Sequence, residues 1–247
     1  MTHPPHTDWR AWWRYTLSWL PVWLGLALAL VGLGYEGSFL WLNAGRLTWL
    51  DVVMPHFTHL GDGLLLFGGV SLWCLAQRRM DLWLLLVATL LGVMVWVFLL
   101  KNFIFHGWHR PSMVFAYPPK DFFMISTRDL SSFSFPSGHA TAAAAATLVA
   151  ALAASSPRLG PWLWGLMGIL LAYSRVYIGV HFGGDILAGS LLGWAWASAL
   201  YAWLWPWLYR WQHTWSQPER WLQLARWLSV LLILVGLFSL YFRYYAL

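Results

Sequence analysis

Charged residues are scarce in this chain. Only 10% of its 247 residues are Asp, Glu, Lys or Arg, whereas 60% are hydrophobic. Soluble globular domains carry roughly 25% charged residues, so a soluble fold of this composition would have too little polar surface. Several apolar stretches also reach or approach the ~20 residues that a helix needs to cross the hydrocarbon core of a bilayer. The composition therefore excludes a soluble globular protein and predicts a membrane protein.

Cysteine is nearly absent, and the basic residues are not clustered. Cys74 is the only cysteine, which excludes an intrachain disulfide, and its place inside an apolar stretch indicates packing. The formal net charge is +6, but Lys and Arg are scattered between apolar stretches. We therefore expect no nucleic-acid partner and expect the protein to associate with anionic lipid of the bilayer. The N-terminus lacks the cleavage pattern of a secretory signal, so the first span is expected to be retained.

The apolar stretches predict seven helices by their length. They run over about 17–34, 63–76, 82–100, 138–155, 161–178, 184–206 and 226–242. The short connections at 77–81 and 155–160 predict antiparallel hairpins. The segment 37–63 mixes polar and apolar residues, which is typical of an amphipathic helix at the membrane interface.

No internal repeat and no soluble domain is visible in the sequence. The predicted fold class is therefore all-α, a polytopic bundle of membrane helices that forms one domain over residues 1–247. Six core spans are expected within about 15–206. The remaining segment, about 207–247, is expected to add a further C-terminal span.

The basic residues also predict the orientation in the membrane. Placing the N-terminus in the cytoplasm puts eight of the 15 Lys and Arg on the cytoplasmic side, namely Arg10, Arg14, Arg78, Arg79, Arg158, Arg210, Arg220 and Arg226. Of the seven on the other side, Lys101, Arg110 and Arg175 belong to the polar clusters described next, so the remaining split is eight against four. This split agrees with the positive-inside rule. We therefore expect a multi-pass protein of a bacterial inner membrane.

Three polar clusters stand at the predicted outer ends of the spans. The first holds Lys101 and Arg110, the second is the sequence Pro-Ser-Gly-His at 136–139, and the third runs from Ser174 and Arg175 to His181 and Asp185. A charged residue inside the bilayer is costly and usually faces a cavity with a function. We therefore expect the three clusters to converge on one site that faces the periplasm or the outside.

These clusters resemble the signature of the type 2 phosphatidic acid phosphatase superfamily. That signature is K-x6-RP, then PSGH, then SR-x5-H-x3-D, and the second and third motifs match here without gaps. In the first motif, eight residues separate Lys101 from Arg110 where the family usually has six. The resemblance covers most of the membrane region except the C-terminal span. It implies a lipid phosphatase that works through a phosphohistidine, without metal or other cofactor.

The chemistry of phosphoryl transfer suggests a role for each motif residue, because it requires an in-line nucleophile and stabilisation of charge on the phosphate oxygens. His181 is the expected nucleophile, and Asp185 would fix its tautomer and stabilise the charge that develops on the ring. His139 is the expected general acid for the leaving lipid oxygen, and later the base that activates water.

The phosphate oxygens would be bound by cations and by neutral donors. The expected cations are Lys101, Arg110 and Arg175, and the neutral donors are Ser137 and the backbone N–H of Gly138 at a helix start. For Lys101, a snorkelling role at the end of the third span is the alternative. For Ser137, helix capping is compatible with phosphate binding.

Two further groups of polar residues were considered on the predicted outer side. The pairs His56 with His59 and His106 with His109 have the spacing of zinc ligands on a helix, but acidic groups to support them are not evident, so no metal site is expected. The loop charges before PSGH are interpreted as solvated, with headgroup contact as the alternative. They are Lys120, Asp121, Arg128 and Asp129.

The sequence is compatible with several functions. A lipid-to-lipid phosphotransferase would show the same motifs. A transporter fits the composition but gives no reason for the motifs, and a serine hydrolase through Ser137 lacks the G-x-S-x-G elbow. The family-level substrates are undecaprenyl diphosphate, phosphatidylglycerol phosphate, phosphatidic acid and a lipid A phosphate, of which the first is favoured.

Overall fold

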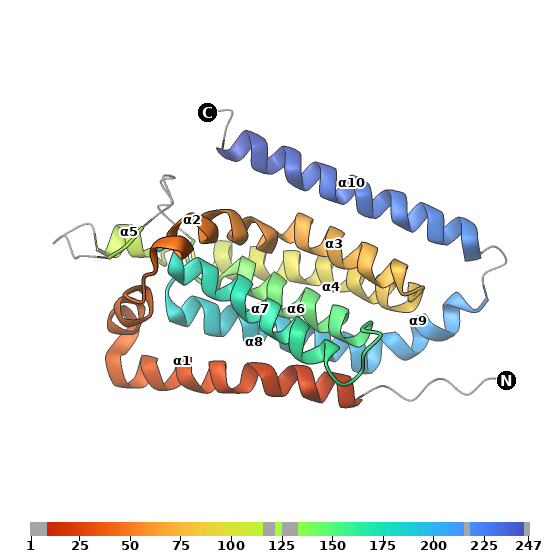
Figure 1. Cartoon of the computed structure of the whole chain (residues 1–247), viewed down its shortest axis with the longest axis horizontal. Coiled ribbons are helices and arrows are strands. Elements are labelled where there is room, and N and C mark those ends of the chain that lie inside the picture. The colour runs from red at the N-terminus through yellow and green to blue at the C-terminus, as the bar shows by residue number, and fades with distance from the viewer. Residues whose placement is uncertain (1–8, 116–121, 125–132, 215–217, 245–247) are drawn as a thin grey trace.

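The structure is a computed structural model that describes residues 9–115, 122–124, 133–214 and 218–244. The loop charges Lys120, Asp121, Arg128 and Asp129 lie outside the described residues. Within these ranges every regular element is a helix, and Figure 1 shows long helices running roughly along one axis. The all-α prediction is therefore confirmed.

The predicted apolar stretches correspond to long helices of the bundle. They are α1 (Trp9–Asn43), α3 (Gly63–Ala76), α4 (Met80–Leu99), α6 (Gly138–Leu152), α7 (Gly160–Tyr177), α8 (Gly183–Trp203) and α10 (Pro218–Tyr244). The short connections predicted between α3 and α4, and between α6 and α7, are present. The segment 37–63, predicted to be one amphipathic helix, instead contains the end of α1, then α2 (Thr48–Phe57) and a 3-10 turn, η1 (Thr58–Gly61).

The centre of the bundle is α6, whose residues 140–152 are all buried. Its alanines present a small surface, so that α3, α4, α7 and α8 can all pack against it. The approach of α8 is especially close, since a Cβ atom added at Gly193 would lie 2.1 Å from the Thr141 carbonyl oxygen. The alanine-rich sequence therefore serves as the packing core around which the site-bearing helices are arranged.

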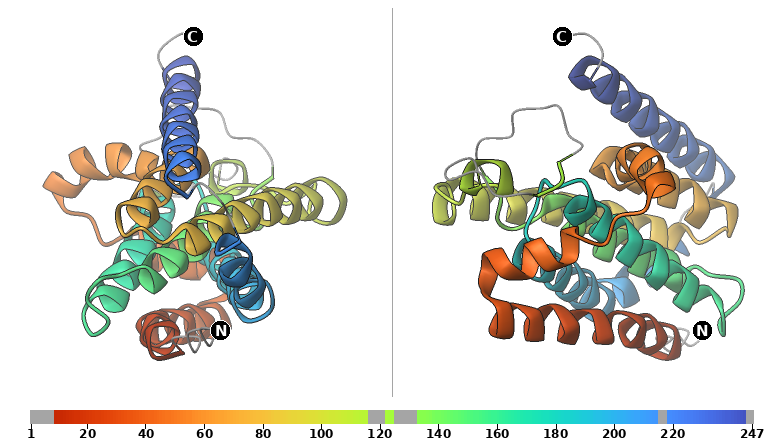
Figure 2. Two further views of the ribbon diagram at one scale, coloured as in Figure 1. Left: turned by 90° about the vertical axis from the view of Figure 1, so that its right-hand side faces the viewer. Right: turned by 60° about the vertical axis from the view of Figure 1, so that its left-hand side comes forward.

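Helices α1 and α10 lie on opposite sides of this core (Figure 2). Helix α1 contacts α7 and α8, whereas α10 contacts α3. The connection to α10 includes α9 (Trp205–Gln212), a short helix at the end of α8. The extra C-terminal helix thus packs on the side of the bundle away from α1.

Several helices are long and apolar enough to cross a membrane. In the described part of the chain these are α1, α4 with its extension to Ile104, α8 and α10, and a fifth is added if the pair α2–η1 and α3, bent by 71°, counts as one span. Helix α6 is apolar but shorter, with 15 residues. A multi-pass membrane protein is therefore confirmed, whereas the count of six core spans plus one stays a prediction.

Candidate active site

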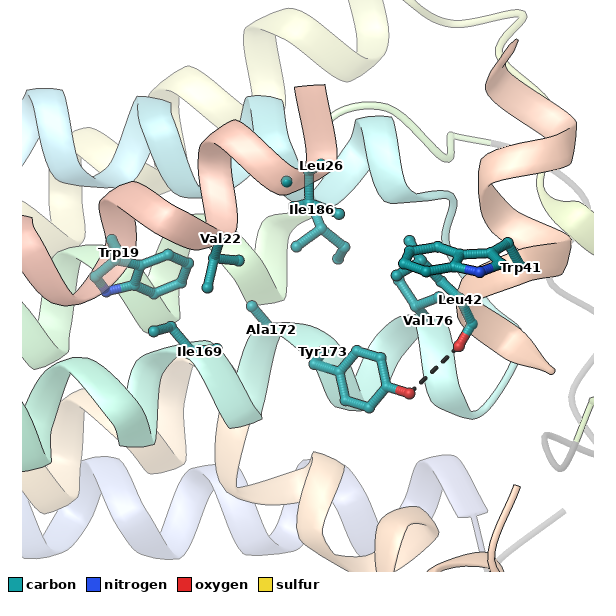
Figure 3. A pocket seen from close by; sticks show the side chains of 11 residues that line it. Trp19, Val22, Leu26, Trp41, Leu42, Ile169, Ala172, Tyr173, Val176 and Ile186 are labelled. Atoms are coloured by element: carbon teal, nitrogen blue, oxygen red, sulfur yellow. Dashed lines mark hydrogen bonds between the residues drawn. The ribbon is translucent and has the colours of Figure 1, made fainter. Parts of the chain in front are cut away.

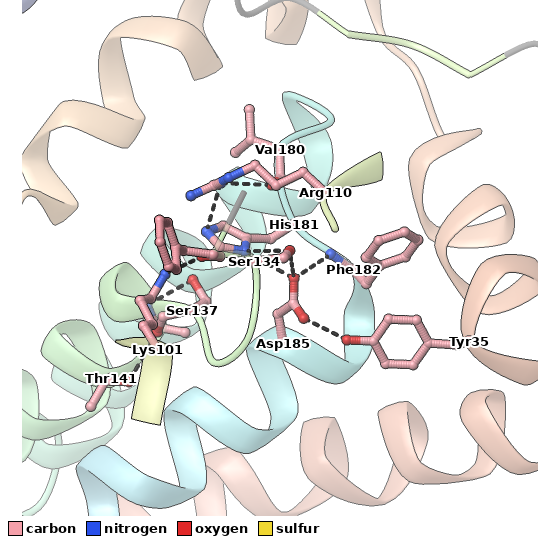
Figure 4. Close-up of polar contacts among 12 residues, drawn as sticks. Tyr35, Lys101, Arg110, Ser134, Ser137, Thr141, Val180, His181, Phe182 and Asp185 are labelled. Carbon is pink, nitrogen blue, oxygen red and sulfur yellow. Dashed lines mark hydrogen bonds and ion pairs between the residues drawn. The ribbon is translucent and has the colours of Figure 1, made fainter. Parts of the chain in front are cut away.

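The three predicted clusters lie at the same end of the bundle. Helix α4 ends there and continues into a π-turn, η2 (Leu100–Ile104), that carries Lys101. Helix α6 begins there after its N-cap Ser137, helix α7 ends there with Arg175 in its last turn, and α8 begins there with Asp185 in its first turn. The antiparallel order of the helices thus brings together motifs that lie far apart in the sequence (Figure 4).

Two of the motifs are joined by a backbone contact. The N–H of Ser137 donates to the carbonyl oxygen of Asp185 at 3.1 Å. The Ser137 hydroxyl oxygen accepts from the backbone N–H of Ala140 at 3.4 Å and so caps α6. The capping role considered from the sequence is therefore present, and the backbone of the PSGH segment is fixed against the start of α8.

His181 and Asp185 form a buried pair. Nδ1 of His181 lies 2.9 Å from Oδ2 of Asp185, and the two residues are 2% and 0% exposed. Asp185 also accepts from the backbone N–H of Phe182 at 3.0 Å. Because the backbone N–H fixes the carboxylate, the carboxylate in turn fixes the imidazole ring.

The other ring nitrogen of His181 faces a cation. Nε2 lies 3.3 Å from Nη1 of Arg110, which also donates to the Val180 carbonyl oxygen at 3.0 Å. An arginine is always a donor, so this arrangement assigns Nε2 as the unprotonated nitrogen and Nδ1–H as the donor to Asp185. The lone pair of Nε2 therefore lies beside the arginine.

Burial, followed by the nearby cations Arg110, Lys101 and Arg175, lowers the pKa of His181 well below its usual value. The ring is consequently neutral at neutral pH. A neutral imidazole with one nitrogen held by a carboxylate and the other unprotonated is the form of histidine that can act as a nucleophile.

The predicted cations are held in place by oxygen atoms. The Lys101 ammonium donates to the Phe133 carbonyl oxygen, and Nη1 of Arg175, which is buried, donates to Oγ1 of Thr58 at 2.9 Å. The same Thr58 oxygen lies 2.9 Å from the Ser174 hydroxyl. The eight residues between Lys101 and Arg110 include the rest of the π-turn and the segment that follows it, and Lys101 lies at this end of the bundle.

His139 is the second residue of α6 and is half-buried. Its ring lies beside η1, since a Cβ atom added at Gly61 would be 3.3 Å from Cδ2 of His139. His139 therefore lies at the same end of the bundle as the His181–Asp185 pair.

Three residues of the site were not predicted from the sequence. Tyr35 and Ser134 each donate a hydroxyl hydrogen bond of 2.5 Å to the Asp185 carboxylate, and Thr58 holds Arg175. Each is an uncharged polar residue with other polar residues close by in the sequence, such as Glu36 after Tyr35 and His59 after Thr58. The sequence around them therefore gives no signal that marks them as partners of Asp185 or Arg175.

Among the residues that the structure describes, no three His, Cys, Asp or Glu side chains gather closely enough to hold a metal ion. The oxygen and nitrogen atoms around His181 come instead from one carboxylate, hydroxyls and cationic side chains. Such a set suits an anionic ligand better than a cation.

An apolar pocket of about 330 Å³ lies between α1, α7 and α8 (Figure 3). Its lining includes Trp19, Leu26 and Trp41 of α1 and Ala172 of α7. Ile186, the residue after Asp185, also lines it. The pocket therefore extends to the residue that adjoins the buried carboxylate.

A comparison with protein families identifies the chain. The family model described as the PAP2 superfamily matches residues 81–209, which is more than half of the sequence. The chain belongs to the PAP2 superfamily. The matched region contains all three motif clusters, so the resemblance seen in the sequence is confirmed.

Two curated PAP2 relatives match over shorter regions. An undecaprenyl-diphosphatase from Sulfolobus acidocaldarius is 42% identical over 74 residues, which is 28% of this chain and 32% of that protein. A phosphatidylglycerophosphatase B from Bacillus subtilis is 44% identical over 71 residues, or 26% of this chain and 35% of that protein. The chain thus matches about a third of the length of each of these relatives.

Two solved PAP2-type structures share the fold more widely. The crystal structure of Aquifex aeolicus LpxE superposes with a TM-score of 0.55 at 28% identity and covers 65% of this chain and 90% of that chain. The crystal structure of a transmembrane PAP2 type phosphatidylglycerolphosphate phosphatase from Bacillus subtilis gives a TM-score of 0.50 at 25% identity, covering 77% of this chain and 95% of that chain. The helical membrane fold is therefore shared over most of the chain.

Proposed function

We propose that this protein is an integral membrane lipid phosphatase that hydrolyses a lipid phosphate or diphosphate through a phosphohistidine on His181. The observation that carries the proposal is the state of this ring, which is buried, held at Nδ1 by Asp185 at 2.9 Å and unprotonated at Nε2, which faces the Arg110 guanidinium at 3.3 Å. Membership of the PAP2 superfamily and the phosphatase names of the relatives support it.

In the first step, the Nε2 lone pair of His181 attacks phosphorus while the bond from phosphorus to the leaving oxygen breaks. The ring becomes positively charged, and Asp185 stabilises that charge through Nδ1–H. His139 donates a proton to the leaving lipid oxygen, so that the lipid departs as a neutral alcohol or, from a diphosphate, as a monophosphate.

In the second step, His139 removes a proton from water, and the resulting hydroxide attacks the phosphohistidine. The P–N bond breaks, its electron pair returns to Nε2, and inorganic phosphate leaves. His181 is again neutral, and His139 is again protonated for the next cycle. The same two histidines therefore serve both half-reactions.

The charge on the phosphate oxygens is balanced by Lys101, Arg110 and Arg175, with the Ser137 hydroxyl and the Gly138 N–H as neutral donors. These groups supply the electrostatic stabilisation that phosphoryl transfer needs. The proposal accordingly includes activity without added metal. Full activity after dialysis against EDTA is expected, whereas complete loss with recovery on adding zinc or magnesium would contradict this part.

A lipid substrate is supported by the apolar pocket beside the site, which offers space for a hydrocarbon chain. Candidate substrates are undecaprenyl diphosphate, phosphatidylglycerol phosphate, phosphatidic acid and a lipid A phosphate. The names of the two curated relatives cover the first two. The two relatives are 42% and 44% identical over 74 and 71 residues, so they support both candidates equally. Undecaprenyl diphosphate stays the favoured candidate, as from the sequence, and the substrate panel below decides between them.

The test is phosphate release by the purified chain in detergent from each of these four lipids, with His181→Ala as the inactive control. Release from at least one lipid by the wild type alone is expected. Equal release by both proteins, or none from any lipid, would contradict the proposal. If label leaves the donor lipid but appears on a second lipid instead of in free phosphate, the protein is a phosphotransferase.

The proposal places the protein in a bacterial inner membrane with the site facing the periplasm, following the excess of basic residues at the opposite end. A cysteine at Met113, which is 45% exposed near the site end, is expected to react with an impermeant thiol reagent in intact cells. A cysteine at exposed Ser156, in the turn between α6 and α7, is the matched control and should react only after lysis. The reverse pattern would overturn the orientation. Cys74 is buried and should not interfere.

A further inference from the structure

The carboxylate of Asp185 receives a hydrogen bond from outside the family motifs. The Tyr35 hydroxyl on α1 donates to Oδ1 of Asp185 at 2.5 Å, whereas His181, Ser134 and the Phe182 N–H all contact Oδ2. The two oxygens thus have different partners, as Figure 4 shows. Tyr35 lies before residue 81, where the family match begins.

The backbone of α1 is broken immediately before this tyrosine. Gly34 has φ 72° and ψ −179°, a combination that is essentially restricted to glycine. A Cβ atom added at Gly34 would meet no atom within 4 Å, so the space around it is open and the constraint is on the backbone alone. The break redirects α1 at Tyr35, which begins the second segment of the helix.

The start of α8 is shaped to receive the tyrosine ring. A Cβ atom added at Gly184 would lie 2.3 Å from Cε2 of Tyr35, so only glycine leaves room for the ring. The ring also packs against Phe182, with centroids 4.8 Å apart, and against Trp108 at 6.0 Å. Gly184 and Phe182 flank the buried end of the helix that carries Asp185, so the ring and the carboxylate are fixed by the same turn.

We propose that Tyr35 is a positioning residue, which orients Asp185 through Oδ1 and thereby sets the proton affinity and the orientation of His181. The inference rests on the proposed function for its catalytic consequence, but the contact itself can be tested without turnover. It assigns to α1, which lies outside the matched family region, a direct part in the site.

The physical consequence of losing this hydrogen bond has a definite sign. Without the Tyr35 donor, the negative charge of Asp185 is less dispersed and attracts the Nδ1–H of His181 more strongly, so the pKa of His181 rises. The other groups that face the pair remain, namely Lys101 of η2, Arg110 before the short helix α5 (Pro111–Val114), Arg175 of α7 and the Ser134 hydroxyl. The variant therefore isolates one donor against an unchanged set of charges.

The experiment compares Tyr35→Phe with Tyr15→Phe. Tyr15 is the matched control because it also lies on α1 and is buried, and its hydroxyl donates to the Ala144 carbonyl oxygen at 2.7 Å, away from Asp185. We expect Tyr35→Phe to lower kcat by about 10-fold or more, the effect of losing one hydrogen bond to a charged group, with KM little changed. In the pH profile of kcat/KM for Tyr35→Phe, the loss of activity on the acid side should move to higher pH. Tyr15→Phe should keep the wild-type pH profile.

A second pair of measurements keeps the inference separate from the proposed function. In ¹⁵N-histidine NMR spectra, with the His181 signal assigned by its loss in His181→Ala, the titration of His181 should move to higher pH in Tyr35→Phe. Gly34→Ala retains the Tyr35 hydroxyl but strains the backbone at residue 34, where α1 changes direction. It should shift the His181 titration to higher pH as well. An unchanged titration in both variants would overturn the role of Tyr35. Absence of phosphate release by the wild type would instead overturn the proposed function and leave this titration as the decisive test of Tyr35.

Discussion

Two buried aspartates lie at opposite ends of this bundle and have different partners. Asp81, at the start of α4, is 1% exposed and accepts from Nε and Nη2 of Arg79 at 3.0 and 2.8 Å and from Nε1 of Trp205 at 2.7 Å. Asp185, at the start of α8, is 0% exposed and is bound by His181, Tyr35, Ser134 and a backbone N–H.

The difference lies in the cation that each carboxylate binds. Arginine stays charged at all physiological pH values, so the Arg79–Asp81 pair can only hold the α3–α4 turn and α9 together. Histidine can gain and lose its charge, so the His181–Asp185 pair can also accept a positive charge that develops during a reaction. The buried aspartate at the start of α4 thus supports stability, whereas the one at the start of α8 can support chemistry.

Replacing Asp185 should have the largest effect on activity. In Asp185→Asn the Nδ1–H of His181 loses its carboxylate, and both the tautomer and the developing charge lose their support. We expect kcat for phosphate release to fall by roughly 100-fold or more. The melting temperature in detergent should be measured alongside, and a kcat within threefold of the wild type would contradict the assigned role.

Asp81→Asn should give the opposite pattern. The change leaves the Arg79 guanidinium without its carboxylate and weakens the bond to Trp205, so we expect a loss of roughly 1–3 kcal/mol in the free energy of unfolding, reduced because Arg79 is partly exposed. Thermal unfolding followed by tryptophan fluorescence measures it. Activity of the folded fraction should be close to that of the wild type, and a selective loss of kcat would break the distinction between the two ends.

The pH dependence of activity should reflect the His181 end of the bundle. Because the pKa of His181 is lowered below 6.5, the ring remains neutral and nucleophilic as the pH falls from 7 through 6.5. The kcat/KM profile, which reports the free enzyme, should therefore lose its acid limb only below pH 6.5. A loss of activity that begins above pH 6.5 would contradict a lowered pKa of His181.

The smallest expected effect concerns the apolar pocket. Gly25 lines it, and an added Cβ there would meet no atom within 4 Å, so we expect Gly25→Leu to fill part of the space. We expect KM for a long-chain lipid to rise about three- to tenfold, with little change for a short-chain phosphate ester. Gly32→Leu is the matched control, since Gly32 is equally open on α1 but does not line the pocket. Equal effects of both variants would argue against a lipid chain in this pocket.

The local parts of the site could be predicted from the sequence. His181 and Asp185 are four residues apart across a helix start, so their contact follows from the motif spacing, and long apolar runs predicted the main helices. The orientation of α1 could not be predicted in this way. Gly34 is one of 21 glycines, and only the structure shows that its backbone breaks the helix.

The unpredicted contacts are all long-range. Tyr35 and Asp185 are 150 residues apart, Thr58 and Arg175 are 117 apart, and Ser134 and Asp185 are 51 apart. No periodicity within one helix encodes such pairs, because they depend on how α1, η1 and the segment before α6 meet the start of α8. The number of spans was likewise not decided by length, since α6 is short and is buried by its neighbours.

The central claim, a phosphoryl group carried by His181, can be tested by trapping it. Wild type and His181→Ala are mixed rapidly with a lipid diphosphate labelled in its terminal phosphate, quenched without acid, and examined for label on the protein. The account predicts label on the wild type that is labile in acid and stable in base, and none on His181→Ala. Label that persists on His181→Ala, or wild-type label on Ser137, would contradict it.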